Sequence, residues 1–138
     1  MYKTVSDFID REYSLRIGES YNTMEPMVFE FKIEDVTFII HPKVDSNSNN
    51  EIVLISIRLL TDDKQLFVNS LKKLKDYFNL YNIPDIGINT NFMISKTKTL
   101  DYNQETQETL ELILWDKVSS LQGRYEIELN IKKDKYVA

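Results

Sequence analysis

Residues 51–81 read EIVLISIRLLTDDKQLFVNSLKKLKDYFNLY and contain the clearest secondary-structure signals in the chain. Over residues 51–60 the apolar side chains alternate with the two-residue period of a β-strand. The residues on its apolar face are Val53, Ile55, Ile57 and Leu59. Over residues 63–81 the period changes to that of an amphipathic helix. The residues of its apolar stripe are Phe67, Leu71, Leu74, Phe78 and Tyr81.

This central helix has a predicted start and a predicted stop. Asp62, three residues before Gln65, matches a capping box, in which side chains satisfy the free N–H groups of the first turn. Pro84 prevents the helix from continuing, because proline has no backbone N–H to donate. Beyond it, residues 86–94 alternate as a strand, which in its longest form runs on to Thr99.

The segments before residue 51 follow the same two periods. A first helix is expected at the N-terminus, followed by two strands joined by a turn at Glu34-Asp35. The expected elements are the helix over 4–17 stopped by Gly18, the strands over 27–33 and 36–41, the second ended by Pro42, and a polar loop over 45–50.

Residues 110–118 fit two interpretations. Their leucines alternate as in a strand, but together with Ile113 they also form a helical stripe. We favour the strand, because Ile113 and Trp115 then form the second face of a hairpin with residues 86–99.

The last strand is expected over residues 125–131, after a turn at Gly123. Glu126 and Glu128 alternate there with apolar residues, which predicts a half-exposed strand with solvated carboxylates. The element order is therefore α-β-β-β-α-β-β-β. Strands joined by short turns favour antiparallel pairing, so we predict an α+β fold with a mainly antiparallel sheet of about six strands. Residues 1–138 are long enough for one domain with a substantial core.

Composition excludes several classes of function. The chain has no cysteine, so it forms no disulfide and no thiolate site. Its 3 glycines are far apart, so neither a Walker loop nor a dinucleotide fingerprint is present. No apolar run approaches the ~20 residues that span a bilayer, and no secretion signal precedes residue 7. We expect no cofactor, no membrane association, and a location in the cytoplasm or inside a host cell.

The net charge of −5 disfavours binding to nucleic acid, because phosphate backbones repel an acidic protein. A local basic patch would require the central helix and the C-terminal segment to be adjacent in space. The lysines concerned are Lys72, Lys73, Lys75, Lys132, Lys133 and Lys135. No aromatic stacking motif is interleaved with them, so we interpret them as solvated surface.

Two further patterns resemble functional sites but are incomplete. His41, the only histidine, is expected at a strand end before Pro42, and no nucleophile motif accompanies it. Asp45, with the asparagines that follow it, imitates the opening of a calcium loop. Asn50 replaces the required glycine, and Ser56 stands where a bidentate glutamate is needed. We therefore predict neither a catalytic histidine nor a metal site.

The segment 99–116 is acidic, contains no basic residue, and carries two aromatic residues. An acidic loop with aromatic anchors suits docking onto a basic protein surface, although a solvated hairpin tip has a similar composition. The candidate partner-binding residues are Asp101, Tyr102, Glu105, Glu108, Glu111 and Trp115.

These observations favour a non-catalytic protein-binding subunit over an enzyme. The leading hypothesis is a small component of a larger phage-like or bacterial assembly, with a protein partner or further copies of itself as neighbours. The alternative is an acidic inhibitor of the immunity or anti-defence type that covers the active site of a basic partner. An enzyme that uses His41 or paired carboxylates is the third class.

Overall fold

The computed structural model describes residues 4–21, 28–80, 96–117 and 123–133. These residues confirm the α+β fold and the order of helices and strands predicted from the sequence. In chain order the elements are α1 (Val5–Tyr13), β1 (Phe29–Ile33), β2 (Val36–Asp45), the short 3-10 helix Ser46–Ser48, β3 (Glu51–Thr61), α2 (Lys64–Phe78), β4 (Lys96–Asn103), β5 (Glu108–Trp115) and β6 (Tyr125–Lys133).

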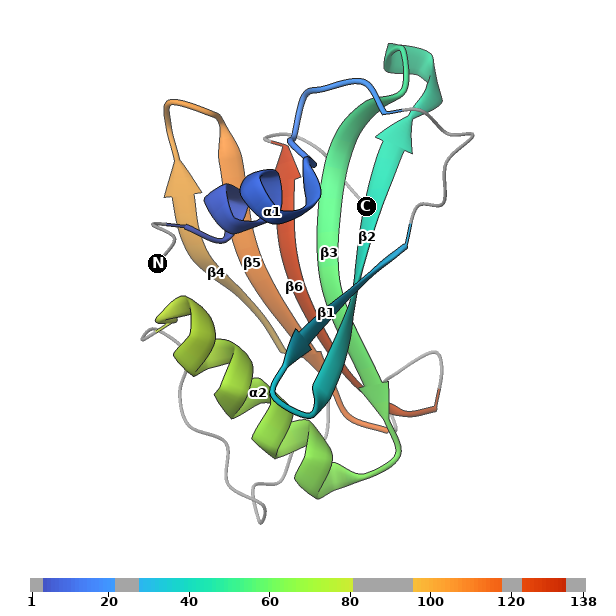
Figure 1. The fold of residues 1–138 in the computed structure, drawn as a ribbon, viewed down its shortest axis with the longest axis vertical. Helices are drawn as coiled ribbons and strands as arrows, with labels where there is room; N and C mark the ends of the chain where they lie inside the picture. Colours follow the sequence, from blue (N-terminus) through green and yellow to red (C-terminus); the bar gives the residue numbers. More distant parts are fainter. Residues whose placement is uncertain (1–3, 22–27, 81–95, 118–122, 134–138) are drawn as a thin grey trace.

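The strands form one antiparallel sheet in the order β1-β2-β3-β6-β5-β4 (Figure 1). The last strand, β6, lies between β3 and β5 and joins the two halves of the sheet. Within residues 110–118 the strand interpretation is confirmed for 110–115, which belong to β5 and pair with β4 on one side and β6 on the other, whereas residue 118 lies outside the described residues. The strand predicted over 86–94 lies outside the described residues, but its extension to Thr99 is part of β4.

Both helices pack against the same face of the sheet (Figure 1). The core lies between them and this face, and its central side chains are almost fully excluded from solvent. The largest of these side chains are Ile9, Phe38, Ile57, Phe67, Leu74, Ile127 and Leu129. We call this surface the helix-covered face, and the opposite surface, which carries neither α1 nor α2, the helix-free face.

Helix α2 confirms most of the predicted stripe but begins at Lys64, one residue later than predicted. Phe67, Leu71 and Leu74 are buried, and Phe78 packs partly buried against the core. The cap is Asp63, whose side chain accepts hydrogen bonds from the first-turn backbone N–H groups. Asp62 instead forms an exposed ion pair with Arg124, so the capping box expected with Gln65 is wrong. Tyr81 lies outside the described residues.

Helix α1 is shorter than predicted. It ends at Tyr13, because Ser14 adopts a left-handed conformation with φ of 56° and its N–H bonds to the Asp10 carbonyl. This reversal sends Leu15 into the core, where it is 1% exposed. Gly18 (φ +92°) belongs to the turn that follows, and its N–H bonds to the Ile52 carbonyl. Apolar spacing alone does not locate the C-terminal end of α1, because Ile17 fits the helical stripe and yet lies after the last residue of the helix.

Strand β2 also differs from the prediction, because it continues through Pro42 to Asp45. The β1 ladder ends at the pair Phe29–Ile40, so Pro42 lies where β2 is laddered only to β3. A proline is tolerated there because no second neighbour needs its missing N–H. His41 is therefore in the middle of a strand and not at its end.

No helix among the described residues is long and apolar enough to cross a membrane.

Candidate binding site on the helix-free face

The helix-free face brings together polar side chains that are far apart in the sequence. The strand register aligns them in rows that run across β2, β3, β6 and β5. One row consists of Ile39, Arg58, Glu128 and Ile113, and the next consists of His41, Ser56, Asn130 and Glu111. Because β6 is interior, its side chains Glu128 and Asn130 are flanked by neighbouring strands on both sides.

Arg58 is the charged centre of this face. Its guanidinium forms an ion pair with Glu126, and its Nε lies 3.4 Å from a carboxylate oxygen of Glu128. The side chains of Arg58, Glu126 and Glu128 are 33%, 6% and 20% exposed. Glu126 and Glu128 are therefore not the solvated pair that alternation suggested, and this prediction is wrong.

The pKa of Glu128 is raised above its ordinary value. Burial is the main cause, and a shared hydrogen bond with Glu126 and the charge of Glu126 act in the same direction. Arg58 and Asn130 oppose this shift, but they do not outweigh it. Arg58 alone thus faces two carboxylates, and one of them is stabilised in its protonated form.

A second ion pair lies in the neighbouring row. Lys132 Nζ is 3.2 Å from Glu111, whose side chain is 12% exposed. Asn130 is 3% exposed and donates through its Nδ2 to Glu111 and to Glu128, at 3.4 and 3.5 Å. The Oδ1 of Asn130 and the indole N–H of Trp115 are buried without a hydrogen-bond partner.

The structure also corrects the basic patch considered from sequence. Lys132 lies on the helix-free face, whereas α2 packs on the opposite one. Lys73 of α2 is paired with Asp35 and Glu34 at 2.7 and 3.1 Å. These hydrogen-bonded pairs raise the pKa of Lys73 and lower that of Asp35.

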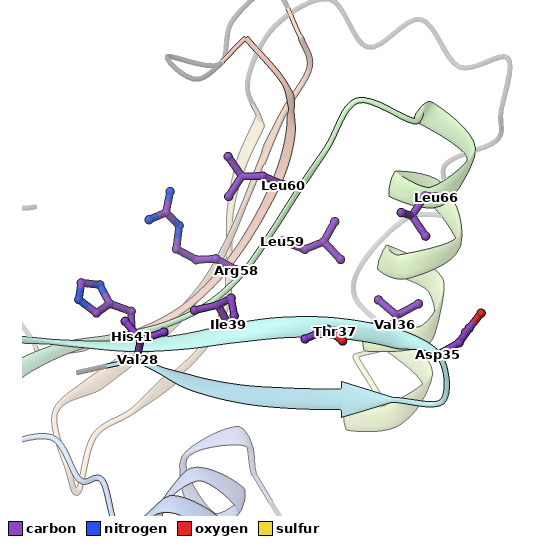
Figure 2. Close-up of a pocket in the computed structure, with 10 residues that line it drawn as sticks. All are labelled: Val28, Asp35, Val36, Thr37, Ile39, His41, Arg58, Leu59, Leu60 and Leu66. Atoms are coloured by element: carbon purple, nitrogen blue, oxygen red, sulfur yellow. The ribbon is translucent and has the colours of Figure 1, made fainter. Parts of the chain in front are cut away.

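A pocket of about 470 Å³ borders Arg58 (Figure 2). It extends from His41 and Val28 along β2 and β3 to the first turns of α2. Its apolar lining residues are Val28, Val36, Ile39, Leu59, Leu60 and Leu66, and its polar ones are Asp35, Thr37, His41 and Arg58. Val28 and Leu66 are 55% and 39% exposed, two of the four large apolar side chains that are exposed among the described residues.

The structure separates the candidate residues of segment 99–116 into three groups. Asp101, Tyr102 and Glu105 are exposed at the β4–β5 hairpin. Glu108 is buried against the start of α1, and burial is the main cause of its raised pKa. Glu111 and Trp115 lie on the helix-free face, opposite Asn130 and Glu126 of β6. The carboxylates therefore do not form one uncompensated field, because Glu111 is paired and Glu108 faces the helix side.

Sequence reasoning missed Arg58, Leu60 and Leu66 as site residues. One signal was present, since Ser56 and Arg58 interrupt the longest apolar run of the chain. An arginine in the middle of an interior strand needs carboxylate partners, but the partners come from a strand nearly 70 positions later.

Two observations bear on metal and His41 chemistry at this face. Within the described ranges, no three His, Cys, Asp or Glu side chains are grouped so as to hold a metal ion. No hydrogen bond or ion pair joins the exposed His41 side chain to another residue described by the structure. A general base is normally oriented by such a partner.

The chain matches no protein-family model, and no curated protein or solved structure is significantly similar to it. The site itself therefore carries the functional argument.

Proposed function

We propose that the protein is a non-catalytic protein-binding subunit and that it holds its partner on the helix-free face and on the adjoining first turn of α2. The observation that carries this proposal is the apolar pocket beside the Arg58 ion pairs. Its rim exposes Val28 and Leu66, and its wall contains an arginine that is already partly desolvated. Binding energy at protein interfaces concentrates at such sites, where apolar side chains surround a shielded charged group.

The proposal extends to the setting in which such a subunit acts. A small acidic domain with one binding face is suited to a larger assembly of the phage-like or bacterial kind, in which neighbours cover that face. In this role the pocket is filled by a neighbouring subunit throughout the life of the assembly. Stable neighbours require well-packed apolar contacts, and the pocket offers them.

A second candidate function is that of an acidic inhibitor which covers the active site of a basic partner. The observation in its favour is the β4–β5 hairpin, where Asp101, Tyr102 and Glu105 are all exposed. Tyr102 is 42% exposed and provides an apolar anchor beside the two carboxylates. In this role the hairpin, and not the pocket, makes the essential contact.

One experiment separates the two. The tagged protein is isolated under native conditions with its bound proteins, and the complex is sized by light scattering. Leu66→Glu and Tyr102→Glu each place one carboxylate on an exposed apolar side chain, so both variants are expected to fold. Loss of the complex with Leu66→Glu alone supports the pocket, and multimeric or ring-like complexes support the assembly role. Loss with Tyr102→Glu alone, in a discrete one-to-one complex, supports the inhibitor and contradicts the pocket.

A further inference from the structure

We propose that the helix-free face recognises a partner segment that places a Lys or Arg side chain against Glu128 and Glu126 and an adjacent aliphatic side chain in the pocket beside Arg58. This inference rests on the proposed protein-binding function and names the chemistry of the partner.

The charge at the centre of the face is unbalanced. When Glu126 and Glu128 are both ionised, they have Arg58 as their one paired cation, because the neighbouring Lys132 is already paired with Glu111. Partly buried carboxylates without a full set of cations are costly, and an added cation removes that cost. The Lys or Arg of a partner is therefore the complement that this face lacks.

The hydrogen-bonding groups favour the same ligand. Carboxylates only accept hydrogen bonds when they are ionised, and the Oδ1 of Asn130, also an acceptor, is buried without a donor. The Nδ2 of Asn130 faces Glu111 and Glu128, and this fixes the orientation of the amide. Ammonium and guanidinium groups are donors without acceptors, so they can bind the carboxylates of Glu126 and Glu128 and the unpartnered Oδ1 of Asn130.

The apolar pocket explains why the cation belongs to a protein segment. Arg58 lines the pocket and contacts both glutamates, so a ligand that reaches Glu128 also touches the pocket wall. Ile39 lies opposite Arg58 on β2, Leu60 lies two residues further along β3, and Ile113 lies opposite Glu128 on β5. A free inorganic cation gains nothing from these side chains, whereas an aliphatic side chain beside a basic one fills the pocket.

Protonation of Glu128 then competes with the partner. The groups that face Glu128 are Arg58 from β3, Glu126 and Asn130 from its own strand, and the uncharged Ile113 from β5. The carboxylate is ionised above its raised pKa and neutral below it. Affinity for a basic segment is therefore expected to fall as the pH drops through that pKa, and the fall should begin at a higher pH than for a carboxylate of ordinary pKa.

The test selects ligands from a randomised peptide library displayed on phage, with the full chain as target at neutral pH. Binding is followed through Trp115, the only tryptophan, whose position opposite Glu126 makes its fluorescence a reporter of this face. We expect the enriched peptides to share a Lys or Arg next to an aliphatic residue. Glu128→Gln should weaken them about tenfold or more and flatten their pH dependence. The matched control is Glu30→Gln, an exposed position on the same face, which should leave affinity unchanged.

The possible results distinguish the inference from the function on which it rests. Peptides that shift Trp115 fluorescence and are lost with Leu66→Glu, but carry no basic residue and ignore Glu128→Gln, would overturn the inference and leave the binding function intact. Peptides whose affinity changes with neither Leu66→Glu nor Glu128→Gln would contradict the inference and would also exclude docking of partners on this face. Self-association of the chain through this face would contradict the inference alone.

Discussion

The two faces of strand β6 both contain buried side chains but differ completely in chemistry. On the helix-covered face, Ile127 and Leu129 are fully buried in the core. On the helix-free face, Glu126 and Asn130 are 5% and 3% exposed. The apolar face gains free energy from burial itself, whereas the polar face must compensate burial with ion pairs.

This difference shows why burial alone does not identify a core. The helix-covered face is filled mainly by matching apolar side chains from the helices and strands. On the helix-free face one arginine serves two glutamates, and three buried atoms, Arg58 Nε, Trp115 Nε1 and Asn130 Oδ1, have no hydrogen-bond partner. Residual electrostatic cost of this kind concentrates at functional sites more often than in structural cores.

The largest expected effect is on the helix-covered face. Leu129→Ala and Leu74→Ala each remove a fully buried side chain and should lower the free energy of unfolding by about 2–5 kcal/mol. The control Leu66→Ala makes the same change at an exposed position and should cost less than about 1 kcal/mol. Urea unfolding followed by Trp115 fluorescence measures all three. Equal losses at positions 66 and 74 would contradict the assignment of the core.

An intermediate effect is expected at the ion pairs of the helix-free face. Arg58→Ala leaves two partly buried carboxylates facing each other and should destabilise the fold by about 1–3 kcal/mol. The control is Arg124→Ala, whose pair with Asp62 is about half exposed on both sides and should contribute less than about 0.5 kcal/mol. If the two substitutions cost the same in urea unfolding, the shielding of Arg58 has no energetic consequence.

The smallest effect is a pH dependence of stability. Because the folded-state pKa of Glu128 is raised, the folded chain binds more protons than the unfolded chain between the ordinary and the raised pKa. Its contribution to stability is therefore lost as the pH rises through the raised pKa. Thermal unfolding across this window should show a flatter profile for Glu128→Gln than for the parent, and higher stability at neutral pH. A profile unchanged by the substitution would mean that Glu128 is not the shifted group.

The pH dependence of stability that remains in Glu128→Gln is expected to come from a second buried carboxylate. Glu108 also has a raised pKa, and it acts with the same sign from the other side of the sheet. Adding Glu108→Gln should therefore remove the pH dependence of thermal unfolding that remains in Glu128→Gln, without affecting the helix-free face.

Local patterns were sufficient to predict the elements but not their neighbours. The alternation of residues 51–60 and the helical stripe of residues 63–81 depend on residues that are close in sequence, so β3 and α2 were predictable. The position of β6 was not, because alternating glutamates look alike on an exposed strand and on an interior strand with cross-strand cations. Only the register of β3 against β6, which places Arg58 opposite Glu128, separates the two cases.

The candidate site was predictable only in part for a similar reason. Glu108 and Glu111 are three residues apart, so in a strand their side chains lie on opposite faces of the sheet. The prediction of one acidic field across residues 99–116 did not take this alternation into account. Tyr102 and Glu105 remain at an exposed hairpin as a turn-rich segment suggests. The pocket was beyond sequence reasoning, because it is assembled from β2, β3 and α2 together with Val28.

The interior position of β6 also determines when the protein can fold during synthesis. Before the ribosome has released residues 125–133, β3 and the β4–β5 hairpin each present an unpaired edge rich in aliphatic side chains. Such edges pair readily with other chains, and pairings between distant segments form slowly. The nascent chain is therefore expected to be prone to aggregation until β6 has been made.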